Sequence, residues 1–167
     1  IALEADWPDT LRVHRHVTGL AQETDTVAAL GDFRRFPAWM WRNTVMVEFV
    51  EWLRARNLRA TNEGDSAGLF GMDLYSMHTS MESVLAYLDK TDADAARRAR
   101  QRYGCFEYFG KDPQAYGYIT TRGKAESCEA EVTAQLVELR RAYGELMNRG
   151  GPDAKNEFFY AEQNARL

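Results

Sequence analysis

The sequence is poor in cysteine and lacks several short motifs that mark catalytic or metal-binding sites. Its 167 residues include only Cys105 and Cys128, with no CxxC pair and no cluster of cysteine with histidine. A tetrahedral zinc site needs more ligands at closer spacing, so we expect neither a metal nor another cofactor. Two isolated thiols are typical of reduced packing residues in a cytoplasmic protein rather than of a disulfide. The GxSxG, HExxH and phosphate-binding glycine-loop motifs are also absent from the sequence.

Basic residues are not in excess, and long apolar runs are missing. The formal net charge is −4, so the bulk charge does not favour binding to nucleic acid or to an anionic membrane surface. No apolar run approaches the ~20 residues that a membrane-spanning helix needs. Because 45% of the residues are hydrophobic, the chain is able to form one domain with a sizeable core. We expect a small molecule as its partner, and the oligomeric state stays open.

Two short apolar runs predict buried parallel strands. Residues 1–3 lead directly into Glu4, and residues 69–72 lead into Asp73. The carboxyl ends of parallel strands meet at one edge of a sheet, where open α/β folds place their sites. The sequence therefore predicts an α/β fold with an open, mainly parallel sheet, of which about two strands are present, and a large helical portion. A helix cap or a structural ion pair is the alternative role for each carboxylate.

Most of the remaining sequence predicts helices. Asp6 is expected to cap a helix that has Pro8 and Asp9 in its first turn, where proline and acidic side chains are favoured. Residues 104–123 are aromatic and are predicted to be irregular. Further helices are expected to begin at Pro37, at the capping box Thr79–Glu82, at residues 91–94, at Ala125 and near Asp153.

Arg42 and the histidines are candidate functional residues on these predicted helices. Arg42 falls on the apolar stripe of the helix expected from Pro37, where a buried guanidinium is costly unless it is paired. It either extends to the surface or holds Glu4 or Asp73 by a bidentate contact. His16 lies on an inward stripe and is predicted to be a satisfied core histidine. His14 is expected to point elsewhere. The two histidines are therefore not a metal-binding pair, which needs a spacing of three or four residues on one helix face.

The segment 125–148 suggests a function of a different class. Its apolar residues from Val132 to Leu146 are spaced four and three residues apart in alternation, which is typical of a helix that packs along one partner helix. A non-catalytic helical module that binds a partner through this seam is therefore an alternative to an enzyme.

Several blocks of sequence, in the same order, resemble the erythromycin esterase family. The blocks are EADWPD (4–9), FPAWMWRN (36–43), GMDLYS (71–76), AARRARQRYGCF (95–106) and FYAEQNARL (159–167). The resemblance spans essentially the whole chain. It implies a hydrolase that opens macrolide lactones, and thereby confers antibiotic resistance, without a metal and without a covalent acyl-enzyme. A hydrolase of the same fold that acts on another ester or amide is the alternative.

The resemblance also implies roles for four residues. Glu4 matches the acidic residue of the family's EADW-type block and is the expected catalytic carboxylate, which orients a histidine while that histidine takes a proton from water. Arg42, Asp73 and Tyr75 are expected to bind substrate. The family's water-activating histidine lies in a Gly-Glu-x-x-His motif upstream of this sequence, and a second histidine-bearing block lies downstream. We therefore expect residues 1–167 to be the central fragment of a single erythromycin-esterase-like domain, inactive alone.

Overall fold

The computed structural model describes residues 1–22, 25–35, 37–109, 113–149 and 153–167. It divides into two compact units, Ile1–Leu74 (unit 1) and Tyr75–Leu167 (unit 2). Within the described ranges, none of the helices has the length and apolar character needed to cross a membrane.

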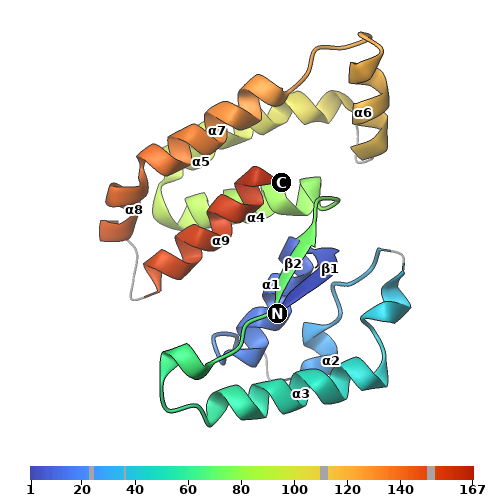
Figure 1. Cartoon of the computed structure of the whole chain (residues 1–167). Helices are drawn as coiled ribbons and strands as arrows, with labels where there is room; N and C mark the ends of the chain where they lie inside the picture. The colour runs from blue at the N-terminus through green and yellow to red at the C-terminus, as the bar shows by residue number, and fades with distance from the viewer. Residues whose placement is uncertain (23–24, 36, 110–112, 150–152) are drawn as a thin grey trace. The chain divides into compact units, whose positions relative to one another are not determined.

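Unit 1 contains a pair of parallel strands packed against a helix. Its elements are β1 (Ala2–Asp6), α1 (Trp7–Val17), α2 (Thr26–Ala29), η1 (Ala38–Met40), α3 (Thr44–Leu58), η2 (Glu63–Asp65) and β2 (Phe70–Asp73). β1 and β2 lie side by side and run parallel (Figure 1), as the two apolar runs predicted. α1 packs against both strands and also against α2 and α3. The predicted α/β fold, with a parallel sheet and a large helical portion, is confirmed.

The strand pairing contains one irregularity that decides which residues face each other. Leu3 pairs with Gly71, and Asp6 pairs with Asp73. Between these two pairs β1 advances by three residues and β2 by only two, so β1 carries one extra residue, as in a β-bulge. Asp6 consequently pairs with Asp73 at the carboxyl edge, where a regular register would have placed Ala5.

The core of unit 1 forms because α1 is covered on more than one side. Its buried hydrophobic residues are Ala5, Val13, Val17, Leu30, Phe33, Val50, Leu53 and Leu69. Each large aliphatic side chain buried in this way contributes about 1.5–3 kcal/mol relative to an exposed position. Asn57, near the end of α3, joins α1 to the segment before β2: its amide nitrogen donates to the carbonyl oxygens of Val17 (3.0 Å) and Ala67 (2.9 Å).

Both histidines of α1 are buried. His16 Nε2 lies 3.1 Å from Thr26 Oγ1, which confirms the prediction of a satisfied core histidine. His14 points elsewhere, as expected, but it is also buried: its ring packs on Phe70 of β2 with the centroids 4.6 Å apart. Burial, followed by the positive charge of Arg15, lowers the pKa of His14 to about 4, so this ring is neutral near pH 7.

The helix expected from Pro37 begins later, at Thr44. Asn43 is its N-cap and accepts a hydrogen bond from the Met46 amide at 2.9 Å through Oδ1. Residues 38–40 form only the short 3₁₀ turn η1, and the Trp39 side chain is 67% exposed. The cap residue decides the start because its side chain satisfies an otherwise unpaired amide of the first turn.

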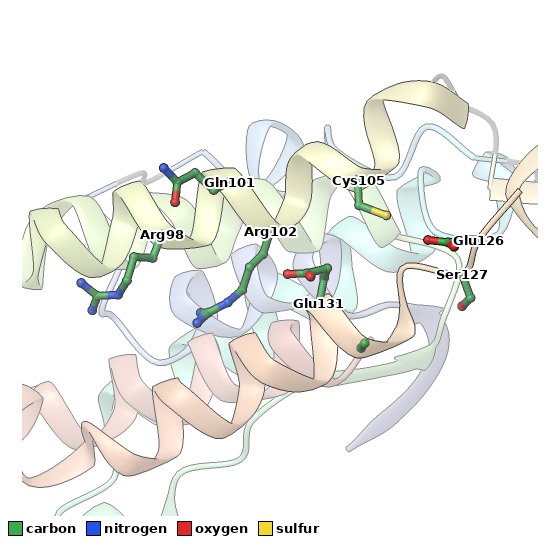
Figure 2. Close-up of a pocket in the computed structure, with 8 residues that line it drawn as sticks. Arg98, Gln101, Arg102, Cys105, Glu126, Ser127 and Glu131 are labelled. Atoms are coloured by element: carbon green, nitrogen blue, oxygen red, sulfur yellow. The ribbon is translucent and has the colours of Figure 1, made fainter.

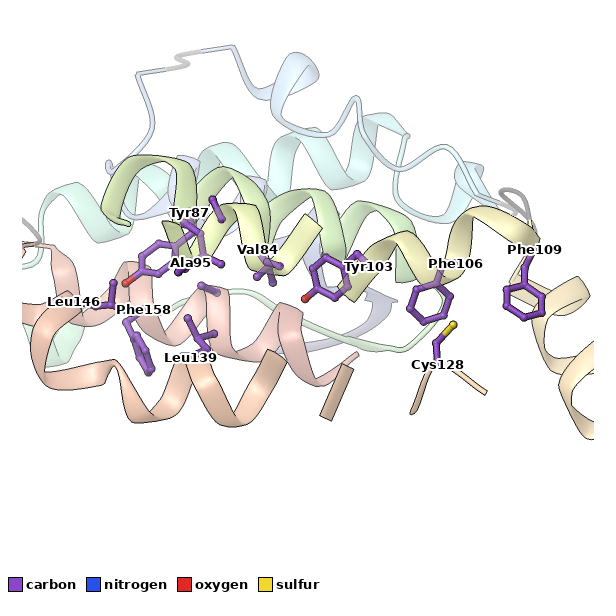
Figure 3. Close-up of a cluster of buried hydrophobic side chains, with 14 residues drawn as sticks. Val84, Tyr87, Ala95, Tyr103, Phe106, Phe109, Cys128, Leu139, Leu146 and Phe158 are labelled. Carbon is purple, nitrogen blue, oxygen red and sulfur yellow. The ribbon is translucent and has the colours of Figure 1, made fainter. Parts of the chain in front are cut away.

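Unit 2 is helical over its described residues. Its elements are α4 (Met77–Thr91), α5 (Ala93–Tyr103), η3 (Gly104–Phe109), α6 (Pro113–Thr121), α7 (Glu129–Arg141), α8 (Tyr143–Arg149) and α9 (Ala154–Arg166). α4 packs against α5 and α9, and α7 packs against the same two helices. Figure 3 shows the buried hydrophobic side chains of this unit, which include Val84, Tyr87, Ala95, Tyr103, Phe106, Phe109, Cys128, Leu139, Leu146 and Phe158.

Three boundaries in unit 2 differ from the sequence prediction. α4 begins at Met77 after Ser76, so the predicted capping box Thr79–Glu82 lies inside the helix. The helix expected over residues 125–148 is interrupted at Ala142 into α7 and α8. The irregular segment predicted after Tyr103 contains η3 and α6. In contrast, α5 begins where predicted, because Asp92 Oδ1 accepts hydrogen bonds from the first amides of that helix.

The seam from Val132 to Leu146 is used within unit 2. Leu139 and Leu146 are buried in its core, and Val132 packs against the same cluster. The tyrosine of the seam, Tyr143, contacts Phe158 edge to face at 4.8 Å. The apolar residues that suggested a partner-binding module therefore pack against the protein's own helices.

The prediction of two reduced thiols is wrong, because Cys105 and Cys128 form a disulfide with their Cα atoms 5.9 Å apart. Cys105 lies in η3 and Cys128 immediately precedes α7, so the bond closes a loop that contains α6. The expected cytoplasmic location rested on reduced thiols, and this basis is removed.

Candidate functional site

One guanidinium joins two carboxylates at the carboxyl edge of the strands in unit 1. Arg35 Nε donates to Asp6 Oδ2 at 2.9 Å, and Arg35 Nη2 donates to Asp73 Oδ2 at 2.8 Å. These contacts raise the pKa of Arg35, chiefly through the hydrogen bond with Asp6. The two carboxylates are held close together by a charge between them, and we call Asp6, Arg35 and Asp73 the edge triad.

Asp6 stands at a helix cap position, but its side chain does not act as a cap. It ends β1 and occupies the N-cap position of α1, as predicted, but its side chain makes no capping hydrogen bond. Oδ2 is taken by Arg35, whereas Oδ1 is buried and has no hydrogen-bond partner among the residues that the structure describes. A buried carboxylate oxygen is a strong acceptor, so Oδ1 is suited to receive a proton donor.

Asp9 adds a third acidic group, beside the two carboxylates of the edge triad. Burial raises its pKa to about 7, and the negative charges of Asp6 and Asp32 act in the same direction against the opposing charge of Arg35. Asp32 is itself paired with Arg12, whose Nη1 lies 2.7 Å from its Oδ2. A carboxyl group that titrates near neutral pH is typical of sites that transfer protons.

The structure separates the four residues predicted for the site. Glu4 lies in mid-strand on β1 with an exposed side chain, two residues before Asp6. Asp73 belongs to the edge triad. Arg42 is exposed in the turn between η1 and α3, and the guanidinium that contacts Asp73 belongs to Arg35 instead. Tyr75 is exposed and belongs to unit 2. Their proposed roles in catalysis and substrate binding stay predictions.

Two members of this site were missed by sequence reasoning. Asp9 carried a usable signal, because it lies three residues after Asp6 and therefore on the same side of the first helical turn. Arg35 carried no such signal: it is 29 residues from Asp6 and 38 residues from Asp73 in the chain. Within the described ranges no three histidine, cysteine or acidic side chains are grouped so as to hold a metal ion.

Unit 2 has a polar pocket of its own, with a volume of about 650 Å³. Figure 2 shows its labelled side chains, which are Arg98, Gln101, Arg102, Cys105, Glu126, Ser127 and Glu131. Both arginines are paired with Glu138, at 2.5 Å from Arg98 Nη2 and from Arg102 Nη1. A smaller pocket of about 350 Å³ in the same unit has walls that include Met81, Phe106 and Tyr116.

These features define an α/β protein whose charged side chains gather where two parallel strands end, which is where open α/β enzymes place their sites. The chain belongs to the erythromycin esterase family, whose model matches residues 1–167. The resemblance of the sequence blocks is thereby confirmed. Membership of this family supports a hydrolase-type function.

The chain is also similar to a protein from Bacillus cereus whose crystal structure is known. The TM-score is 0.68 with 18% sequence identity, and the match covers 99% of this chain and 37% of that protein. At this level of identity the similarity concerns the fold alone. The chain spans little more than a third of the length of the solved relative.

Proposed function

We propose that the protein containing this chain hydrolyses a macrolide lactone or a related ester by direct attack of water on the carbonyl carbon. The observation that carries the proposal is the edge triad, in a chain that belongs to the erythromycin esterase family. The triad fixes the end of β1, the strand that carries Glu4. A carboxylate beside a histidine orients the ring and increases its basicity, as general-base activation of water requires. Metal and covalent acyl-enzyme have no part in the proposed reaction.

The proposed roles follow from the chemistry of each side chain. A neutral histidine outside this chain, in the family's Gly-Glu-x-x-His motif, takes the proton from water, and Glu4 orients that histidine. Arg42, Asp73 and Tyr75 contact the substrate. Arg35 already binds two carboxylates, so its role is to fix the carboxyl edge rather than to stabilise the oxyanion. The donor for the oxyanion therefore comes from another group.

His14 and His16 do not serve as the base in this proposal. Both are buried in unit 1, where His16 bonds Thr26 and His14 packs on Phe70. A general base has to approach within hydrogen-bond distance of the attacking water, either directly or through one further water. Two rings held inside the core do not meet this condition.

The proposal is tested in the full-length protein by following ring opening of a macrolide, which adds one water to its mass. Glu4→Gln keeps the shape of the side chain and removes its charge, and it is expected to lower kcat by about 100-fold or more. Glu48→Gln, at an exposed position on α3, is the matched control and is expected to retain full activity. Wild-type turnover in the Glu4 variant would remove Glu4 from the mechanism. Hydrolysis of simple esters without macrolide turnover would indicate the alternative substrate class.

A further inference from the structure

The two cysteines of the disulfide in unit 2 differ in their exposure to solvent. Cys105 is partly exposed and lines the 650 Å³ pocket, whereas Cys128 is 0% exposed. Figure 2 shows the Cys105 sulfur among the polar side chains of that pocket, and Figure 3 shows Cys128 beside Phe106 in the core. We propose that the pocket is a thiol–disulfide exchange site, at which a small uncharged or cationic thiol attacks the sulfur of Cys105.

The reaction is an exchange between two sulfur–sulfur bonds. The incoming thiolate forms a bond to Sγ of Cys105 while the bond between Cys105 and Cys128 breaks, and the electron pair of that bond stays on Sγ of Cys128. The buried Cys128 then takes up a proton. A second thiolate attacks the external sulfur of the mixed disulfide and releases Cys105 as a thiolate. Two small thiols are oxidised to their disulfide, and the protein disulfide is reduced to two thiols.

Accessibility decides which sulfur is attacked. The nucleophile approaches in line with the sulfur–sulfur bond, so the attacked sulfur has to be open on the side opposite the leaving sulfur. Cys105 lines the pocket and Cys128 is fully buried, so a thiol in the pocket can reach Cys105 alone of the two. Cys128 occupies the N-cap position of α7, where the positive end of the helix dipole stabilises negative charge as it develops on the leaving sulfur. The geometry makes Cys105 the attacked residue and Cys128 the leaving residue.

The charges around the pocket select the class of thiol. Arg98 and Arg102 share the single carboxylate of Glu138, while Glu126 and Glu131 also line the pocket. Two positive and three negative charges leave a net charge of −1. A cationic thiol is therefore attracted to the pocket and an anionic thiol is repelled, and salt weakens both effects.

Reduction of the disulfide also affects the smaller pocket of unit 2, because two residues of its wall lie in the loop that the disulfide closes. The Tyr116 hydroxyl accepts a hydrogen bond from the Cys128 amide at 3.1 Å and lies 3.0 Å from Ser127 Oγ. Tyr116 and Phe106, from the loop that the disulfide closes, are walls of the 350 Å³ pocket. Reduction removes the covalent bond that holds these walls to α7, so the redox state controls the shape of the smaller pocket.

The test uses the full-length native protein with cysteamine, 2-mercaptoethanol or 3-mercaptopropionate at equal thiolate concentrations. Adducts are trapped by acid and located by peptide mass mapping. Each rate is divided by the rate of the same thiolate with a small uncharged disulfide, because a more basic thiolate is a stronger nucleophile. We expect the first adduct on Cys105, with a normalised rate about fivefold higher for cysteamine than for 3-mercaptopropionate at low salt and a smaller ratio at about 0.5 M salt. A first adduct on Cys128 would overturn the proposal. So would exchange that proceeds only at the rate of global unfolding, measured in increasing urea.

A pair of variants tests the electrostatic part separately. Removing both pocket carboxylates, by Glu126→Gln with Glu131→Gln, is expected to bring the rates of the cationic and anionic thiols together. Glu82→Gln, at an exposed position on α4 outside the pocket lining, is the matched control and should leave their ratio unchanged. An undiminished ratio in the double variant would refute the selection for cationic thiols.

Discussion

Replacing Gly71 with alanine tests whether the close approach of β1 and β2 maintains the edge triad. A Cβ at Gly71 would lie 2.5 Å from the carbonyl oxygen of Ala5 and 2.6 Å from that of Asp6. Ordinary contact begins at 3.4 Å, so the strands would have to move apart by about 0.9 Å (3.4 − 2.5). Both opposing atoms belong to the backbone, which cannot rotate away as a side chain can. Overpacking costs typically about 1–3 kcal/mol, and we expect the upper part of that range here.

The assay is chemical denaturation followed by tryptophan fluorescence. Trp7 stacks on Phe70 with the ring centroids 5.6 Å apart, so its signal reports the segment next to the substitution. Gly64→Ala is the matched control, because a Cβ there meets nothing within 4 Å. If the Gly71 and Gly64 variants have the same free energy of unfolding, the strand spacing is more adaptable than the structure indicates, and the reasoning is refuted.

Three further predictions concern charge and covalent structure. The pKa of Asp9 is raised to about 7, so the ionised side chain is unfavourable in the folded state and stability falls as the pH rises from about 4 to above 7. In urea titrations, Asp9→Asn should raise the free energy of unfolding at pH 8 by about 1–2 kcal/mol, after allowance for solvent screening. At about pH 4 the variant should have the same free energy of unfolding as the wild type. Arg35→Gln should lower stability by about 1 kcal/mol at low salt and by less at high salt, whereas exposed Arg34→Gln should have little effect. Replacing Cys105 and Cys128 by alanine opens a loop with a separation of 23 residues and should lower the free energy of unfolding by about 3 kcal/mol; an unchanged denaturation midpoint would contradict the disulfide.

The strand pair and the first helix could be predicted because their signals are local. Residues 1–3 and 69–72 are short apolar runs that each lead into acidic residues, and the parallel pairing of such strands is a common solution in α/β folds. Pro8 and Asp9 marked the first turn of α1 in the same way, since each is favoured there for its own backbone or charge properties.

The composition of the edge triad could not be predicted, because it depends on long-range geometry. The extra residue in β1 has no sequence signature, and it moves the pairing with Asp73 from Ala5 to Asp6. Arg35 reaches both carboxylates from a segment without helical or strand periodicity. The disulfide was missed for a related reason: two cysteines 23 positions apart become partners only when the fold brings their Cα atoms within bonding range.

The irregularity in β1 separates two functions of one short strand. Before it, Leu3 contributes to the hydrophobic core, and after it, Asp6 meets Asp73 and Arg35. Side chains of a regular strand alternate strictly between the two faces, so the position of Leu3 would also fix the face on which Asp6 lies. With the additional residue, Leu3 faces the core and Asp6 still pairs with Asp73. A protein engineer who transfers this charged edge to another parallel sheet must therefore transfer the inserted residue with it, since without it Asp6 would be out of register with Asp73.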